Sequence, residues 1–134
     1  MVGGRGIRRA REALDLVRYG PLSRRETQLR LMFWRGGLPE PELNLKVHAP
    51  GGRFIHMLDL AHPEFQVGTE YESLIHQDST KFRRDIRKQQ ELAAIGWSIH
   101  RLTSEEVDPR LCTPASRAAL ARIAADLRSR GWSG

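Results

Sequence analysis

The middle of the chain limits the possible fold more than any other part of the sequence. Residues 43–47 alternate apolar and polar side chains, and residues 54–60 and 65–72 are also typical of strands. A Pro-Gly-Gly turn separates the first two runs, and residues 61–64 form a second turn before the third. The sequence therefore predicts three strands in an antiparallel meander.

Helical spacing of apolar residues predicts three helices around these strands. The first begins at Ser23, which forms a capping box with Glu26, and it ends at a Gly-Gly pair. The second covers residues 79–95 and the last covers 114–130, with a fourth strand at 97–102. The residues expected to face the core are Phe82, Ile86, Leu92 and Ala93 in the second helix and Leu120, Ile123, Ala124 and Leu127 in the last. The order helix, three strands, helix, strand, helix predicts an α/β fold, a mixed sheet flanked by helices.

The formal net charge of +6 is concentrated near the N-terminus. Residues 1–35 carry nine arginines against three acidic residues, whereas the rest of the chain is neutral overall. A basic segment on a neutral body indicates a polyanionic partner or, equally, a solvated arm that aids solubility. We interpret residues 1–20 as a basic N-terminal arm or linker, compatible with a longer chain, and residues 21–134 as one domain.

Several features bear on the compartment of the protein. The sequence contains no apolar run of membrane-spanning length, and its first dozen residues lack the apolar stretch of a signal peptide. Cys112 is the only cysteine, so no internal disulfide forms and a zinc site built on several thiolates is excluded. These features predict a soluble, cytoplasmic protein without a membrane partner.

Three acidic residues lie within the predicted strands. Glu70 and Glu72 are two apart, so they project from the same face, and the short turn brings Asp59 beside them. Converging carboxylates raise one another's pKa, and oxygen ligands suit Mg²⁺ or Mn²⁺. The sequence therefore predicts a metal site at Asp59, Glu70 and Glu72. The alternative is that Asp59 only precedes a turn and that the glutamates lie on the solvent face of an edge strand.

Further polar residues follow the predicted metal ligands. His76 has the chemistry of a general acid or base or of a metal ligand, although a single loop histidine is commonly a surface residue. The other four histidines are interpreted as structural or exposed. The basic side chains of the following helix form either a solvated face or a phosphate-binding surface. With two arginines of the first helix, the predicted nucleic-acid contacts are Arg24, Arg25, Lys81, Arg83, Arg84, Arg87 and Lys88.

Five motifs in order, covering about two thirds of the chain, share compatible spacing with a known family. They lie at residues 23–30, 59–64, 67–76, 82–87 and 92–101 and include Asp59-Leu60-Ala61, Glu70-Tyr71 and Gly96-Trp97. Together they resemble the small bacterial endonuclease domains related to very-short-patch repair enzymes, within the PD-(D/E)xK nuclease superfamily. Each motif alone is weak, and the set is specific.

The resemblance implies a restriction-endonuclease-like core and Mg²⁺-dependent hydrolysis of phosphodiester bonds, in DNA rather than RNA. It implies that Asp59 and Glu70 hold the metal. Glu72 stands at the position of the superfamily's catalytic lysine, which this branch usually replaces with Asp. His76 matches the branch's histidine. Glu26 matches a first-helix glutamate that approaches the site, with its capping role as an equal alternative.

Two departures from the family pattern leave other functions open. His62 replaces the expected Trp, and Glu72-Ser73 replaces an Asp-Gly pair, so activity could be weakened or lost. The alternatives are a catalytically inactive nuclease fold that only binds nucleic acid, and an effector nuclease of a toxin–antitoxin or defence system that acts on RNA. A plain interaction domain with a charged surface is the third.

Overall fold

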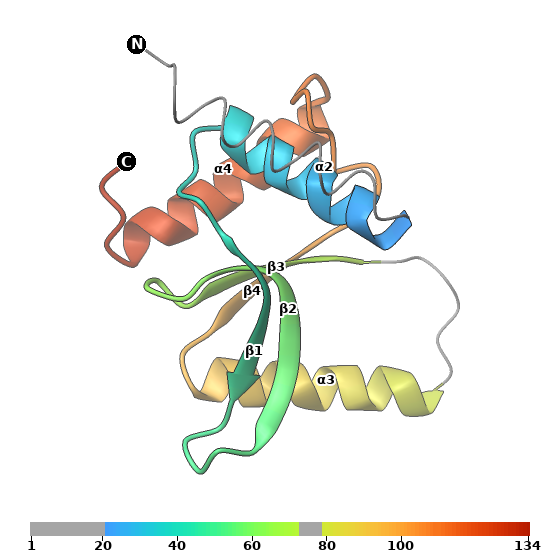
Figure 1. Ribbon diagram of the computed structural model, residues 1–134, viewed down its shortest axis with the longest axis vertical. Coiled ribbons are helices and arrows are strands. Elements are labelled where there is room, and N and C mark those ends of the chain that lie inside the picture. The colour runs from blue at the N-terminus through green and yellow to red at the C-terminus, as the bar shows by residue number, and fades with distance from the viewer. Residues whose placement is uncertain (1–20, 73–78) are drawn as a thin grey trace.

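The computed structural model describes residues 21–72 and 79–134, which fold into three helices around a four-stranded sheet (Figure 1). In chain order the elements are α2 (Pro21–Arg35), β1 (Glu42–His48), β2 (Phe54–His62), β3 (Val67–Tyr71), α3 (Ser79–Ala94), β4 (Ser98–Leu102) and α4 (Pro114–Ser129). This order confirms the predicted α/β fold with a mixed sheet. The predicted arm at residues 1–20 and His76 lie outside the described residues. Within the described ranges, no helix has the length and apolar character needed to cross a bilayer.

The strands lie in the sheet in chain order, β1-β2-β3-β4. β1 and β2 pair antiparallel, as do β2 and β3, which confirms the predicted meander. β4 instead runs parallel to β3, and α3 makes the crossover that a parallel pair requires. Parallel strands place their carboxyl ends at the same edge of the sheet. The ends of β3 and β4 therefore meet where Tyr71 pairs with Leu102.

The helices cover both faces of the sheet (Figure 1). α2 and α4 lie on one face, and the core there consists of Leu29, Met32, Phe33, Leu38, Leu60, Val67, Leu102, Ala119, Ile123, Ala124 and Leu127. Leu120 packs partly buried against this core, so the predicted apolar stripe of α4 is largely confirmed. α3 lies on the other face, where Leu92 packs with Val47, Ile55, Leu58 and Ala61. Each fully buried Leu or Phe contributes about 1.5–3 kcal/mol, so the larger core dominates stability.

The predicted inward face of α3 is mostly wrong. Leu92 is buried, but Phe82 is 58% exposed, Ile86 is 39% exposed and Ala93 is also exposed. The physical reason is that the apolar cluster on this face contacts α3 only near its C-terminal end, at Leu92. The N-terminal half of the helix has an apolar stripe, and among residues 21–72 and 79–134 no buried cluster lies beneath it.

The boundaries of α2 and β2 also differ from the prediction. α2 begins at Pro21, because proline fits the first turn of a helix, where its missing N–H needs no partner. Ser23 therefore lies inside the helix, and the predicted capping box with Glu26 is wrong. β2 continues to His62, so the turn begins later than predicted. His62 is buried as a structural residue: its Nε2 donates to the Pro39 carbonyl at 2.7 Å, and its ring stacks on Phe33.

Candidate active site

Two of the predicted metal ligands lie side by side where β2 and β3 separate. The last paired residues of these strands are Leu60 and Thr69, and the next residues toward this end are Asp59 and Glu70. Beyond this point the Asp59 side chain serves as a hydrogen-bond acceptor for β3, since its Oδ2 accepts from the backbone N–H of Tyr71 at 3.1 Å. The predicted convergence of Asp59 and Glu70 is therefore present in the structure.

The electrostatics of Asp59 follow from this position. Burial is the main cause that raises the pKa of Asp59 above its ordinary value, and the negative charge of Glu70 raises it further. The hydrogen bond from the Tyr71 backbone and the nearby His56 act in the opposite direction but do not cancel the shift. A carboxylate held in this way gains from a positive partner.

A histidine and an arginine lie against Glu70 and Glu72. His56 Nε2 is in hydrogen-bond contact with Glu70 Oε1. Arg101 of β4 is the register partner of Glu70, and its guanidinium lies 3.8 Å from both Glu70 Oε2 and Glu72 Oε1. Because Arg101 reaches both glutamates, Glu70 and Glu72 project to the same side, as their spacing predicts.

These residues line one open cleft of about 280 Å³ at the end of the sheet. We name it the carboxylate cleft, and its lining is His56, Met57, Asp59, Glu70, Tyr71, Glu72, Lys81, Asp85 and Arg101. Among residues 21–72 and 79–134, no group of three or more His, Cys, Asp or Glu side chains is arranged to hold a metal ion. Asp59 and Glu70 are thus a pair of neighbouring carboxylates and do not belong to a larger group of this kind among the described residues.

Glu26 approaches the same site from the other side of the sheet edge. It shares a hollow of about 320 Å³ with Asp59, Asn44 and Tyr71. Burial is the first cause that raises the pKa of Glu26, and the charge of Asp59 adds to it, while a hydrogen bond with the Asn44 side chain lowers it. Asn44 has a positive φ of 52°, a conformation that Asn tolerates better than most residues. With the capping role removed, Glu26 remains a candidate site residue.

The predicted nucleic-acid contacts divide into separate places. Lys81 lines the carboxylate cleft, whereas Arg84, Arg87 and Lys88 line a second groove beside the β1–β2 hairpin. The Arg25 guanidinium lies 4.3 Å from the centre of the Tyr71 ring, near Glu26. Arg24 and Arg83 are exposed.

Sequence reasoning missed His56 and Arg101. Arg101 is the last residue of the motif at 92–101, so a signal was present in the sequence. Its role depends on the parallel pairing of β3 and β4, which places it directly beside Glu70. His56 precedes Asp59 by three residues in the same strand, and only the structure shows that its ring turns toward Glu70.

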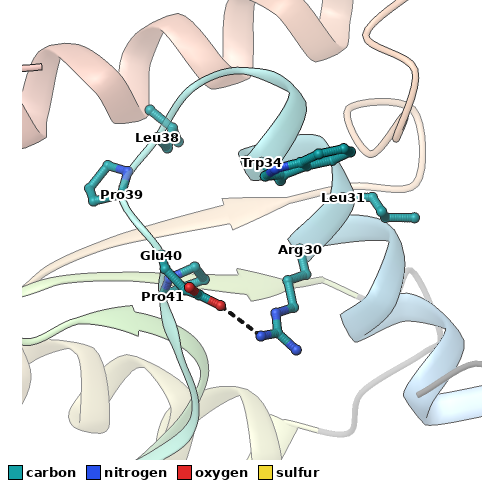
Figure 2. Close-up of a pocket in the computed structure, with 7 residues that line it drawn as sticks. All are labelled: Arg30, Leu31, Trp34, Leu38, Pro39, Glu40 and Pro41. Carbon is teal, nitrogen blue, oxygen red and sulfur yellow. Dashed lines mark hydrogen bonds and ion pairs between the residues drawn. The ribbon is translucent and has the colours of Figure 1, made fainter. Parts of the chain in front are cut away.

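A different hollow lies between α2 and the segment that follows it (Figure 2). It is lined mainly by Leu31, Trp34, Leu38 and two prolines. An ion pair crosses it, because Arg30 Nη2 lies 2.8 Å from Glu40 Oε1. Its walls are apolar apart from this pair, so it lacks the convergent ionisable groups expected of a catalytic site.

Comparison with known proteins adds relatives but no family. No family model matches the chain, and no solved structure matches it. The chain is similar to an uncharacterized protein of Mycobacterium tuberculosis strain CDC 1551 / Oshkosh and to one of strain ATCC 25618 / H37Rv. Each is 34% identical over 106 residues, which cover 78% of this chain. The chain spans only 39% of the length of each relative.

Proposed function

We propose that the protein is a metal-dependent endonuclease that hydrolyses phosphodiester bonds of DNA. The observation that carries this proposal is the pair Asp59 and Glu70, which lie on neighbouring strands in one cleft with cationic side chains around them. The element order and the parallel pairing of β3 with β4 support a restriction-endonuclease-like core. Metal-assisted hydrolysis of phosphodiesters needs such an acidic centre beside positive charge.

The residues present fit Mg²⁺ or Mn²⁺ in their chemistry. Mg²⁺ prefers oxygen ligands and is usually held by one or two carboxylates, with water and substrate phosphate completing its shell. Asp59 and Glu70 would hold the ion, with Glu72 as a further carboxylate on the same side. When bound, the ion would supply a more acidic water and positive charge for the phosphate.

The cations of the cleft have a role beside the carboxylates. Glu72 stands where the superfamily carries a lysine, so another cation must face the phosphate. Lys81 and Arg101 line the cleft, whereas Arg87 lines the other groove. We assign charge stabilisation of the phosphate to Lys81 and Arg101. We assign proton exchange to His56 Nε2, which is in contact with Glu70. His76 keeps the same proposed role by resemblance.

A plasmid-nicking assay tests the proposal. Nicking is expected with Mg²⁺ or Mn²⁺ and not with EDTA. Asp59→Ala and Glu70→Ala should each lower the rate at least about a hundredfold, because each removes a carboxylate that would hold the metal ion, and the ion would stabilise the charge that develops on the phosphate. Glu105→Ala is the matched control, since Glu105 is an exposed acid outside the cleft. Nicking by Asp59→Ala at the wild-type rate would contradict the proposal.

A second function is favoured by one observation. His56 and Arg101 already lie against the glutamates that a metal would need, and the described residues form no larger ligand group. A nuclease fold that binds nucleic acid without cutting it would have this arrangement. It predicts salt-sensitive DNA binding with no nicking at any metal concentration.

A further inference from the structure

The groove beside the carboxylate cleft combines charge with an exposed aromatic ring. This basic groove, of about 410 Å³, is lined by Arg53, Phe54, Ile55, Arg84, Arg87, Lys88 and Glu91. The first three come from the β1–β2 turn and the start of β2, and the other four come from α3. Its volume lies in the range of about 300–1,000 Å³ in which proteins hold small ligands, so it has room for a nucleotide.

The charge of the groove suits a polyanion. Four cationic side chains face one acid, Glu91, so the lining has a net positive charge. Both terminal nitrogens of Arg53 lie 3.2 Å from Glu91 Oε2, but the Arg53 side chain is 65% exposed. An ion pair this exposed holds its partners weakly, so a phosphate can compete for Arg53.

The exposed ring of Phe54 bears on whether the groove suits a single strand or a duplex. The Phe54 residue is 50% exposed, and its ring meets the His48 ring edge to face with centroids 5.8 Å apart. A surface that binds only phosphates gains nothing from an exposed ring. An unpaired base can stack on such a ring, whereas the bases of a duplex are already stacked on one another.

The basic groove and the carboxylate cleft share two elements, β2 and α3. β2 passes from Phe54 in the groove to Asp59 in the cleft, and α3 contributes Lys88 to the groove and Lys81 to the cleft. At a rise of about 3.3 Å per residue, β2 covers about 17 Å between these points. That length matches about five nucleotides stacked about 3.4 Å apart.

We propose that the basic groove binds a single-stranded segment of DNA that continues into the carboxylate cleft. Its phosphates lie along Arg84, Arg87 and Lys88, and one base stacks on Phe54. The base on Phe54 is about five nucleotides from the phosphate in the cleft. The position of a phosphate in the cleft rests on the proposed function. The binding of a single strand in the groove does not require cleavage.

Fluorescence anisotropy in EDTA tests this, because it measures binding when no cleavage can occur. The probes are an unstructured DNA strand of about twelve nucleotides, within the usual size of single-strand sites, and its duplex. The wild-type protein should bind the single strand about tenfold more tightly than the duplex. Phe54→Ala should lose that preference, and Phe54→Trp should keep it, because a larger ring still stacks. A strand of about four nucleotides should bind the wild type more weakly than the strand of about twelve nucleotides does, since it is too short to reach from the groove into the cleft.

Phe82→Ala is the matched control, since Phe82 is as exposed as Phe54 but is not part of the groove lining. Equal wild-type affinity for strand and duplex would overturn the inference. So would an unchanged preference in Phe54→Ala, or an equal loss in Phe82→Ala. These outcomes are independent of nicking: a protein that never cuts but binds single strands through Phe54 would refute the proposed activity and keep the inference.

Discussion

The two faces of the sheet differ in how completely they are covered. Beneath α2 and α4, eleven buried residues of the described chain form one cluster, and His62 is enclosed with them, stacked on Phe33. Beneath α3, five buried residues form a smaller cluster that meets the helix only at Leu92. Exposed apolar side chains such as Phe54 and Phe82 belong to this second side. The difference indicates that one face supplies stability, while the other leaves surface available for a ligand.

The carboxylate cleft lies where this difference is greatest. Glu70, Glu72 and Arg101 are at the open ends of β3 and β4, beside the N-terminal half of α3. Water and ligands can enter there because the described residues form no apolar cluster beneath Phe82. A complete core on this face would have buried the same carboxylates at a high cost.

The largest expected effect on the free energy of unfolding comes from replacing a buried leucine with alanine on each face of the sheet. Leu127→Ala on α4 and Leu92→Ala on α3 each remove a buried leucine, which is 0% and 1% exposed respectively. We expect Leu127→Ala to lower the free energy of unfolding by about 4 kcal/mol and Leu92→Ala by about 2 kcal/mol, because the smaller cluster can relax around its cavity. Urea denaturation followed by circular dichroism measures both. Equal losses in the free energy of unfolding would contradict the inference that the two cores contribute unequally to stability.

The free energy of unfolding should depend on pH through His62, on the face of the sheet that α2 and α4 cover. Burial is the main cause that lowers the pKa of His62 below its ordinary value of 6.5. The unfolded chain therefore binds the proton more tightly, so His62 contributes stability that is present above pH 6.5 and is lost as the pH falls toward its folded-state pKa. Titration of this one group changes the free energy of unfolding by at most about 1.4 kcal/mol per pH unit.

Denaturation at several values between about pH 7.5 and pH 5 measures this loss. His62→Gln keeps an N–H donor for the Pro39 carbonyl and removes the titration, so its stability should change less over this range. A wild-type slope in His62→Gln would assign the effect to another group.

At the carboxylate cleft, stability and function should oppose each other. The pKa of Asp59 is raised in the folded state, so the contribution of this group is greatest below its unfolded value of 3.8 and is lost as the pH rises. Asp59 therefore stabilises the fold less once its carboxyl group has lost its proton. Asp59→Asn can still accept from the Tyr71 backbone, and it should raise the stability by about 1 kcal/mol while abolishing nicking. A less stable Asp59→Asn protein would show that the carboxylate is held for structural reasons.

The sequence was sufficient for the order of elements and for the pair at Asp59 and Glu70. Both depend on local patterns, since alternation defines a strand and a short turn fixes which strands pair. Arg101 could not be assigned in the same way, because its contact with Glu70 depends on the register of two strands joined through a helix. The exposure of Phe82 was also missed, since an apolar stripe does not say how far the sheet extends beneath it.

The smallest expected effect is at Phe82 itself. Phe82→Ala removes a side chain from a 58% exposed position, so little buried area is lost, and alanine favours the helix more than phenylalanine does. The free energy of unfolding should change by no more than about 0.5 kcal/mol. The same substitution at Phe33, which is 0% exposed, should cost about 3–5 kcal/mol. A loss above about 1.5 kcal/mol in Phe82→Ala would mean that the N-terminal half of α3 packs against an apolar surface, and the face beneath it would then be closed to a DNA strand.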